Sequence, residues 1–171
     1  MKTIFLLLFT FLGGCSAKTQ DSTAPIMNTI DLKNTIKSQP RTILFVWTSW
    51  CGVSDEILQN TYLKHQDSFL KNDMNVILLC GSANQDPIIE SINSNKKLKA
   101  FYLEGSNTSI PYFNRKNIEK TLNDVFDKKS IEKIFEGNFG IPITFIVDSS
   151  LNVIYPNAPQ KFSELKHFYF N

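Results

Sequence analysis

Cys51 stands where an apolar segment gives way to a helical pattern, in the stretch WTSWCGVS at residues 47–54. Residues 42–47 predict a strand buried on both faces, and residues 52–70 carry apolar side chains at helical spacing. A cysteine at the start of a helix faces unpaired backbone N–H groups and the positive end of the helix dipole. Such surroundings lower a cysteine pKa from about 8.5 to roughly 3.5–7.5, and the thiolate is the reactive form. We therefore predict a reactive thiol at Cys51, with Trp50 shielding the sulfur from one side.

A second motif, Gly140-Ile141-Pro142, lies directly before the apolar run at residues 143–147. Proline has no N–H to give to a sheet, so it suits the first position of a strand or a cis bend. The five-residue linker from Asp148 to Asn152 joins this strand to residues 153–155. A linker that short predicts an antiparallel hairpin.

The remaining apolar patterns supply the elements that must position these two motifs. Residues 75–80 predict a second buried strand, so that strand, helix and strand form a unit with parallel strands and a right-handed crossover. The further expected elements are a short helix at 31–36, a strand at 98–103, one or two amphipathic helices at 117–135 and a terminal helix at 162–170.

The two motifs together resemble the active site of the thioredoxin superfamily. Trp47 and Trp50 match the tryptophans that precede the family's nucleophile, Cys51 matches the nucleophile, and Ile141-Pro142 matches its cis-proline site. The resemblance covers about residues 31–170. It implies an α/β thioredoxin-like fold with a central mixed sheet flanked by helices and a helical insertion before the cis-proline strand.

The resemblance also implies a peptide-binding surface around the nucleophile. Partner peptides would lie along the Pro142 loop, and the substrate-binding residues would be Trp50, Gly52, Val53, Ile141 and Pro142.

Two positions depart from the thioredoxin pattern, because Ser54 replaces the family's second cysteine and Phe45 replaces its buried acid. A hydroxyl cannot form the disulfide that releases a substrate from Cys51. Without a second thiol, the acid that would move its proton has no task. We therefore assign Cys51 and Ser54 to the catalytic positions and expect one half-reaction, in which a thiolate attacks a disulfide and stays bound as a mixed disulfide.

Cys80 ends the second buried strand and has two interpretations. Neighbouring parallel strands share one carboxyl edge, which would bring Cys80 to the same edge as Cys51. Cys80 is then a second thiol that resolves the mixed disulfide, provided that the two Cα atoms approach within about 7 Å. Alternatively, Cys80 is a buried residue that packs like a small hydrophobe.

The first fifteen residues, MKTIFLLLFTFLGGC, have the pattern of an export signal. The apolar run at 4–12 is far shorter than the roughly 20 residues that a membrane-spanning helix needs. Leu12-Gly13-Gly14-Cys15 resembles a bacterial lipobox, which implies that Cys15 is lipidated; the alternative is an ordinary signal peptide. We expect a signal peptide at 1–14, a lipidated tether at 15–30 and a thioredoxin-like domain at 31–171, held at a bacterial envelope membrane.

Composition excludes several other classes of protein. The 171 residues are 42% hydrophobic and 20% charged with a net charge of +2, which fits one globular domain and provides no basic field for nucleic acid. Three cysteines are too few for a disulfide scaffold. His65 and His167 are the two histidines, and the paired cysteines of thioredoxin-like copper chaperones are absent, so we expect no metal and no cofactor.

Two functions remain from these observations. In the first, Cys51 takes part in thiol–disulfide exchange with cysteine-containing envelope proteins or with another thiol–disulfide protein. In the second, the domain keeps the binding groove but has no redox cycle. A low-pKa, accessible Cys51 favours the first function, and an inert or covered Cys51 favours the second.

The lipobox interpretation predicts that the chain partitions into detergent and carries acyl chains, whereas Cys15→Ser is soluble or remains unprocessed. Phase partitioning and mass spectrometry of the N-terminus measure both properties. Membrane partitioning of Cys15→Ser equal to that of the wild type would show that Cys15 is not the anchor.

Overall fold

The structure is a computed structural model that describes residues 25–81, 87–103, 115–136 and 140–171. Cys15, the expected signal peptide and most of the expected tether lie outside the described residues. Within these four ranges, no helix combines the length and apolar character needed to cross a membrane.

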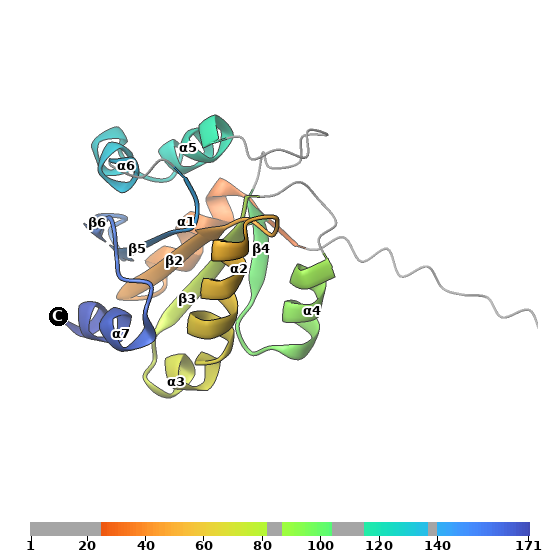
Figure 1. Ribbon diagram of the computed structural model, residues 1–171. Coiled ribbons are helices and arrows are strands. Elements are labelled where there is room, and N and C mark those ends of the chain that lie inside the picture. The colour runs from red at the N-terminus through yellow and green to blue at the C-terminus, as the bar shows by residue number, and fades with distance from the viewer. Residues whose placement is uncertain (1–24, 82–86, 104–114, 137–139) are drawn as a thin grey trace, which may run out of the picture.

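Six strands form one mixed sheet in the order β1-β4-β3-β2-β5-β6 (Figure 1). The first four strands in this order pair in parallel, whereas β5 is antiparallel to both β2 and β6. The strands are β1 (Ile26–Met27), β2 (Arg41–Trp47), β3 (Asn75–Cys80), β4 (Ala100–Leu103), β5 (Ile143–Asp148) and β6 (Val153–Tyr155). The expected parallel pairing of residues 42–47 with 75–80 and the expected hairpin at 143–155 are confirmed.

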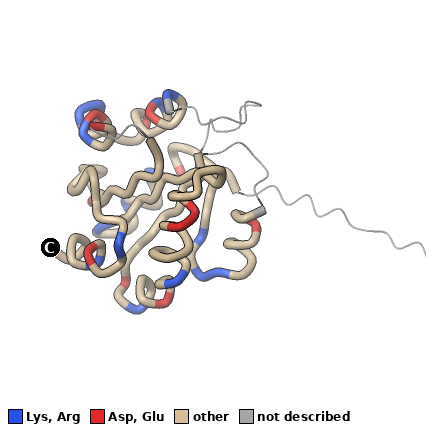
Figure 2. Tube along the Cα trace, in the orientation of Figure 1, with Lys and Arg blue, Asp and Glu red and all other residues tan. Residues whose placement is uncertain are grey.

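Eight helical segments surround the sheet among the described residues. They are α1 (Thr29–Lys37), α2 (Gly52–Ile57), the π-helix η1 (Leu58–Leu63), α3 (Gln66–Lys71), α4 (Pro87–Asn95), α5 (Arg115–Asn123), α6 (Lys128–Phe135) and α7 (Phe162–Phe170). Acidic and basic residues are intermixed on these outer helices (Figure 2).

Side-chain alternation along β2 gives the sheet two apolar faces. Ile43, Phe45 and Trp47 pack on the face covered by η1, α3, α4 and α7. Leu44 and Val46 pack on the opposite face, which α1, α5 and α6 cover. The apolar run in β2 is uninterrupted because both faces of this central strand are buried.

The segment expected as one helix at 52–70 is three helical segments. The α-helical hydrogen bonding of α2 gives way to the wider turns of η1 at Leu58. A break follows η1 at His65, the N-cap of α3, whose φ of −104° and ψ of 15° are not helical. The periodicity of apolar residues did not reveal this change, because both kinds of helix bury residues on one side of the same axis.

Two elements were not expected from the sequence. The two-residue strand β1 pairs with β4, and Asn28 caps α1 by accepting a hydrogen bond from the Asp31 N–H at 2.8 Å. The folded domain therefore begins before residue 31, inside the segment expected as a tether. The helix α4 was also missed, because its sequence PIIESINSN contains serine and asparagine, which form helices poorly.

The segments between β3 and β5 form the expected helical insertion together with an additional strand. The helices α4, α5 and α6 accompany β4, which extends the sheet beyond β3. The strand predicted at 98–103 is confirmed from Ala100 onward.

The register between β2 and β5 brings the two predicted motifs together. Val46, near the end of β2, pairs with Ile143, the first residue of β5. Because the strands are antiparallel, the segment that follows β2 and the segment that precedes β5 leave the sheet at the same edge. Cys51 and Pro142 are therefore neighbours although 90 residues separate Cys51 from Ile141.

Candidate functional site

Cys51 occupies the N-cap position of α2, with φ −97° and ψ 110°, and is half-buried. A tight turn delivers it there, since its N–H donates to the Thr48 carbonyl at 3.4 Å. Its own carbonyl accepts the first helical hydrogen bond, from the Asp55 N–H at 3.0 Å. The N–H groups of the intervening first turn have no intrahelical acceptor and lie around the sulfur.

The Cys51 thiol lies against the Pro142 loop. Its Sγ donates to the Ile141 carbonyl oxygen at 3.7 Å, and the Ile141–Pro142 peptide bond is cis. Both Ile141 and Pro142 are half-buried, so neither residue is sealed inside the core. The Cys51 thiol and the Pro142 loop, which are far apart in the sequence, are therefore adjacent in the structure.

Ser54 lies completely buried three residues after Cys51. Its Oγ makes no hydrogen bond to another described residue, as is also true of Trp47 Nε1 and Thr48 Oγ1. A thiolate at Cys51 is a stronger acceptor than the neutral thiol. Hydrogen bonds that the Ser54 N–H and hydroxyl donate to this thiolate lower the pKa of Cys51, burial opposes them in part, and the Val53 N–H adds to the lowering.

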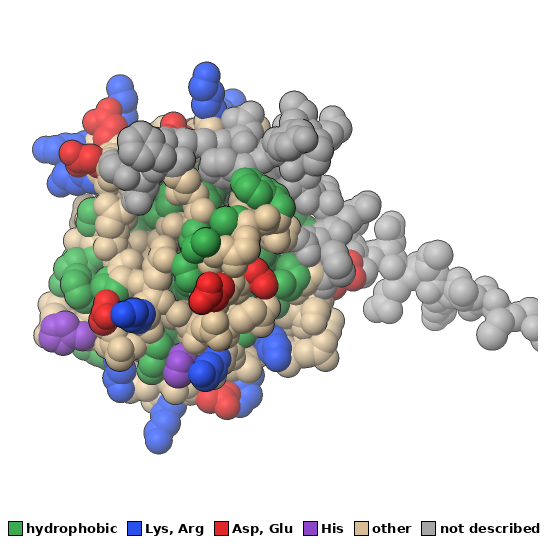
Figure 3. Space-filling view, viewed as in Figure 1, with side chains coloured by type: hydrophobic (Ala, Val, Ile, Leu, Met, Phe, Trp, Pro, Cys, Tyr) green, Lys and Arg blue, Asp and Glu red, His purple; other side chains and the backbone are tan. Residues whose placement is uncertain are grey.

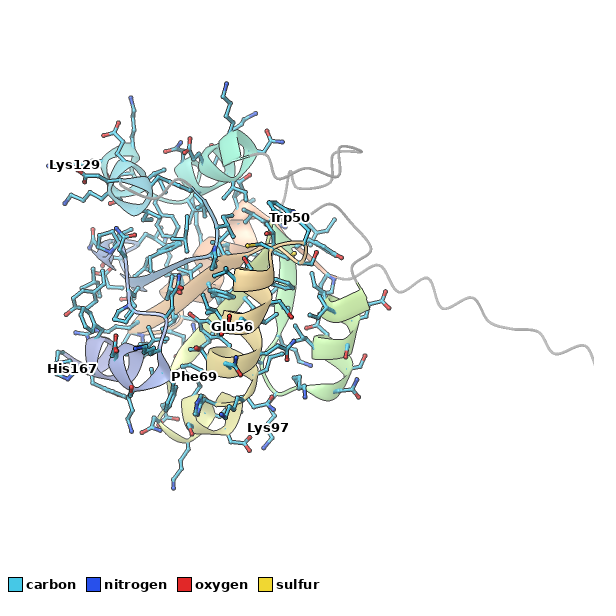
Figure 4. The ribbon with its side chains drawn as sticks, in the orientation of Figure 1. Trp50, Glu56, Phe69, Lys97, Lys129 and His167 are labelled. Atoms are coloured by element: carbon cyan, nitrogen blue, oxygen red, sulfur yellow. The ribbon has the colours of Figure 1, made fainter. Side chains whose placement is uncertain are left out.

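Two large apolar side chains are exposed around this thiol. Trp50 and Val53 are each 59% exposed, and Gly52 between them faces open space. Figure 4 shows Trp50 at the end of α2 that carries the sulfur, and Figure 3 shows hydrophobic side chains reaching the surface over this region. The predicted substrate-binding residues therefore surround Cys51 on one surface.

Phe45 is fully buried and stacks on Tyr62, with 4.4 Å between the ring centroids. The Tyr62 hydroxyl and the Thr144 hydroxyl are 3.0 Å apart and hydrogen-bonded. Burial raises the pKa of Tyr62, so its hydroxyl stays protonated and is not a base near neutral pH. An aromatic stack with one neutral polar pair thus stands where the thioredoxin pattern would place an acid.

Cys80 lies opposite Trp47 in the β2–β3 register and is fully buried in the same core cluster. Both Cys51 and Cys80 are free thiols. The burial of Cys80 matches its interpretation as a small core residue, whereas the partial exposure of Cys51 makes Cys51 the accessible thiol of the pair.

The two histidines lie apart from this site. His65 stacks on Phe162 with 4.4 Å between ring centroids, and His167 contacts Asn171 near the end of α7. Across the part of the chain that the structure describes, no three His, Cys, Asp or Glu side chains group together as a metal site would require.

Tyr62 and Thr144 fall within the apolar patterns at 52–70 and 143–147, which give no sign of their hydrogen bond. Thr144 carries the one signal that could have drawn attention to them, since it is a polar residue in the otherwise apolar start of β5. Its partner, Tyr62, is indistinguishable from any other aromatic core residue in a helical pattern.

Comparison with solved structures identifies the fold. A thiol:disulfide interchange protein from Bacteroides sp. superimposes with a TM-score of 0.50 at 12% sequence identity, covering 88% of this chain and 90% of that one. No protein-family model matches the sequence. No curated protein matches it either. The sheet order and this similarity show that the chain has a thioredoxin-like fold, as the sequence motifs predict.

Two further structures are similar at lower TM-scores. A domain of a possible thiol-disulfide isomerase from Cytophaga hutchinsonii has a TM-score of 0.49 and 18% identity, covering 85% of this chain and 87% of that one. The thioredoxin domain of a thiol-disulfide oxidoreductase from Bacteroides vulgatus has a TM-score of 0.47 and 10% identity, covering 81% and 84%.

Replacing Ser54 with alanine should raise the pKa of Cys51, because it removes a donor to the thiolate. A hydrogen bond to a charged group contributes roughly 1.5–3 kcal/mol, and about 1.4 kcal/mol is a tenfold change in the thiolate fraction. Below both pKa values the variant holds less thiolate, so alkylation of Cys51 slows by up to about tenfold, and above both values the two rates converge. The measurement is the pH profile of iodoacetamide alkylation at Cys51, located by mass spectrometry.

The control for this variant is Ser163→Ala, which removes an exposed hydroxyl on α7 and should leave the profile unchanged. Identical profiles for Ser54→Ala and the wild type would show that the Ser54 hydroxyl does not stabilise the thiolate.

Proposed function

We propose that the protein takes part in thiol–disulfide exchange through a single reactive cysteine, Cys51, and captures cysteine-containing partner proteins as mixed disulfides. The observation that carries the proposal is the 3.7 Å contact between Cys51 Sγ and the Ile141 carbonyl, directly before Pro142. It combines an accessible thiol of lowered pKa with a backbone segment on which a partner chain can lie.

The proposed step is one nucleophilic substitution at sulfur. The Cys51 thiolate attacks one sulfur of a partner disulfide, the partner S–S bond breaks, and the other partner sulfur leaves with the bonding electron pair as a thiolate that water protonates. The product is a mixed disulfide between Cys51 and the partner. Release requires a second thiolate, from the partner itself or from a separate thiol–disulfide protein, because Ser54 has no sulfur to attack the new bond.

The partner surface in this proposal is formed by the exposed Trp50 and Val53 side chains and by the backbone of Ile141 and Pro142. The apolar side chains bury the partner's surface, which favours association without requiring a particular sequence. The neutral Gly52 between them leaves space for the partner backbone to approach the sulfur.

The place of action in the proposal is the bacterial envelope, with the chain anchored by lipid on Cys15. It is supported by the sequence of the first fifteen residues, in which two glycines precede the cysteine. A tether of about ten residues would then separate the anchor from β1.

The second candidate function is a redox-inactive binding module on the same surface. The exposure of Trp50 and Val53 favours it, since both would support binding without any chemistry at Cys51. The two functions differ in whether the sulfur forms covalent bonds.

Replacing Ser54 with cysteine should create disulfide reductase activity that the wild type lacks or nearly lacks. The new thiol would lie on the first helical turn beside Cys51, at a buried position that holds a side chain of similar size. The gain should be partial, because the Phe45–Tyr62 stack provides no proton acceptor for the new thiol. Turbidimetric reduction of insulin with a supplied dithiol measures the activity.

The matched control for this gain is Ser54→Cys combined with Cys51→Ser, which should be inactive. Strong activity of the wild type that survives replacement of Cys80 would contradict the single-thiol proposal, since neither Ser54 nor Cys80 would then be needed for turnover.

A further inference from the structure

The segment between β6 and α7 is bonded to the start of β5 by two consecutive hydrogen bonds. The Ala158 N–H donates to the Thr144 carbonyl at 2.8 Å, and the Gln160 side-chain Nε2 donates to the Pro142 carbonyl at 3.2 Å. The two acceptors are two residues apart, one on β5 and one directly before it, as expected for carbonyls that point to the same edge of an extended chain. Gln160 therefore extends this edge by one hydrogen bond, up to the cis-proline.

The other edge of the same backbone faces Cys51. Ile143 pairs with Val46 of β2, and the Ile141 carbonyl accepts from the Cys51 thiol. Carbonyl direction thus alternates along the segment, with Ile141 toward the sulfur and Pro142 toward Gln160. The Ile141 carbonyl belongs to the peptide before the proline ring and the Pro142 carbonyl to the peptide after it, so the ring, whose φ is fixed, joins the two bonded carbonyls.

Gln160 is itself held by the π-helix. The Thr61 hydroxyl donates to the Gln160 backbone carbonyl at 2.6 Å, and the adjacent Tyr62 hydroxyl bonds Thr144 at 3.0 Å. Consecutive residues of an α-helix point about 100° apart, yet Thr61, Tyr62 and Leu63 are all buried. The wider turn of η1 thus lets two neighbouring side chains reach the same strand region, Thr61 through Gln160 and Tyr62 directly.

We propose that Gln160, supported by Thr61, is a positioning residue that holds the Pro142 carbonyl and thereby fixes the Ile141 backbone edge on which a partner chain aligns with Cys51. The inference rests on the proposed thiol–disulfide exchange. Gln160 does not touch the sulfur, so its contribution concerns the alignment of a peptide and not the reactivity of the thiol. Rigid placement of a binding segment before the partner arrives accelerates the reaction with that partner.

The test compares a peptide substrate with a small reagent on the full chain. The peptide carries one cysteine as its mixed disulfide with thionitrobenzoate, and attack by Cys51 on the peptide sulfur releases the coloured thiolate. Gln160→Met keeps the length of the side chain and removes its donor, and should slow this reaction about 3- to 10-fold, as the loss of one hydrogen bond predicts. The pH profile of iodoacetamide alkylation at Cys51 should stay unchanged, because this reagent needs no alignment.

A matched control is Gln66, the first residue of α3. Gln66 of α3 accepts a hydrogen bond from the Lys97 N–H at 2.8 Å, and Figure 4 shows Lys97 at the end of the molecule opposite Trp50. Gln66→Met should therefore leave both rates unchanged. Thr61→Val should slow the peptide reaction in the same direction as Gln160→Met, and Thr61→Ser, which keeps the hydroxyl, should restore it.

The outcomes distinguish a failure of the Gln160 positioning role from a failure of the proposed thiol–disulfide exchange. An unreactive wild type would overturn the proposed exchange and the positioning role with it. A reactive wild type with an unchanged peptide rate in Gln160→Met, or with equal losses in the peptide and iodoacetamide reactions, would overturn the positioning role alone. If Gln160→Met does not fold, the Thr61→Val and Thr61→Ser pair decides by the same two rates.

Discussion

The antiparallel register between β2 and β5 is the constraint on which the site depends. Pairing of Val46 with Ile143 makes the chain leave β2 and enter β5 at one edge, so Cys51 and Pro142 meet although they are distant in sequence. The apolar faces of these two strands hold that register, since a slip by one residue would turn every buried side chain of β2 to the wrong face. The position of the Cys51 thiol beside the Ile141 carbonyl follows from this pairing.

Ser54 and Phe45 stand where the thioredoxin pattern has a second cysteine and a buried acid. Ser54 is a buried donor that bonds no other described residue, and this position suits an anionic sulfur at Cys51 better than a neutral one. Phe45 fills the place of the acid and stacks on Tyr62, so this part of the core is stabilised by aromatic packing. An acid at position 45 would be buried among these rings at a desolvation cost, and its pKa would be raised. The site therefore has donors that stabilise a thiolate at Cys51, and position 45 holds no acid that could accept a proton from a thiol at position 54.

Apolar patterns predicted the central strands and the flanking helices other than α4, and a short linker predicted the hairpin; these features depend on local patterns and on the general rules of strand pairing. The meeting of Cys51 with Ile141 and Pro142 was implied by the resemblance to the thioredoxin active site. The change from α2 to η1, the two-residue β1 and the contacts of Gln160 depend on tertiary packing, and their residues have no distinctive local pattern. Gln160 in particular is a polar residue in a loop, and only its distance to Pro142 distinguishes it from a solvated side chain.

The central claim is that Cys51 forms covalent bonds with partner proteins, and trapping of mixed disulfides tests it most directly. Bacterial cells that express the wild type, Cys51→Ser or Cys80→Ala are quenched with acid, blocked with an alkylating reagent and compared on non-reducing gels. The account predicts complexes that a reducing agent dissolves in the wild type and in Cys80→Ala, and their loss in Cys51→Ser. Equal complexes in all three chains, or complexes lost only in Cys80→Ala, would contradict it.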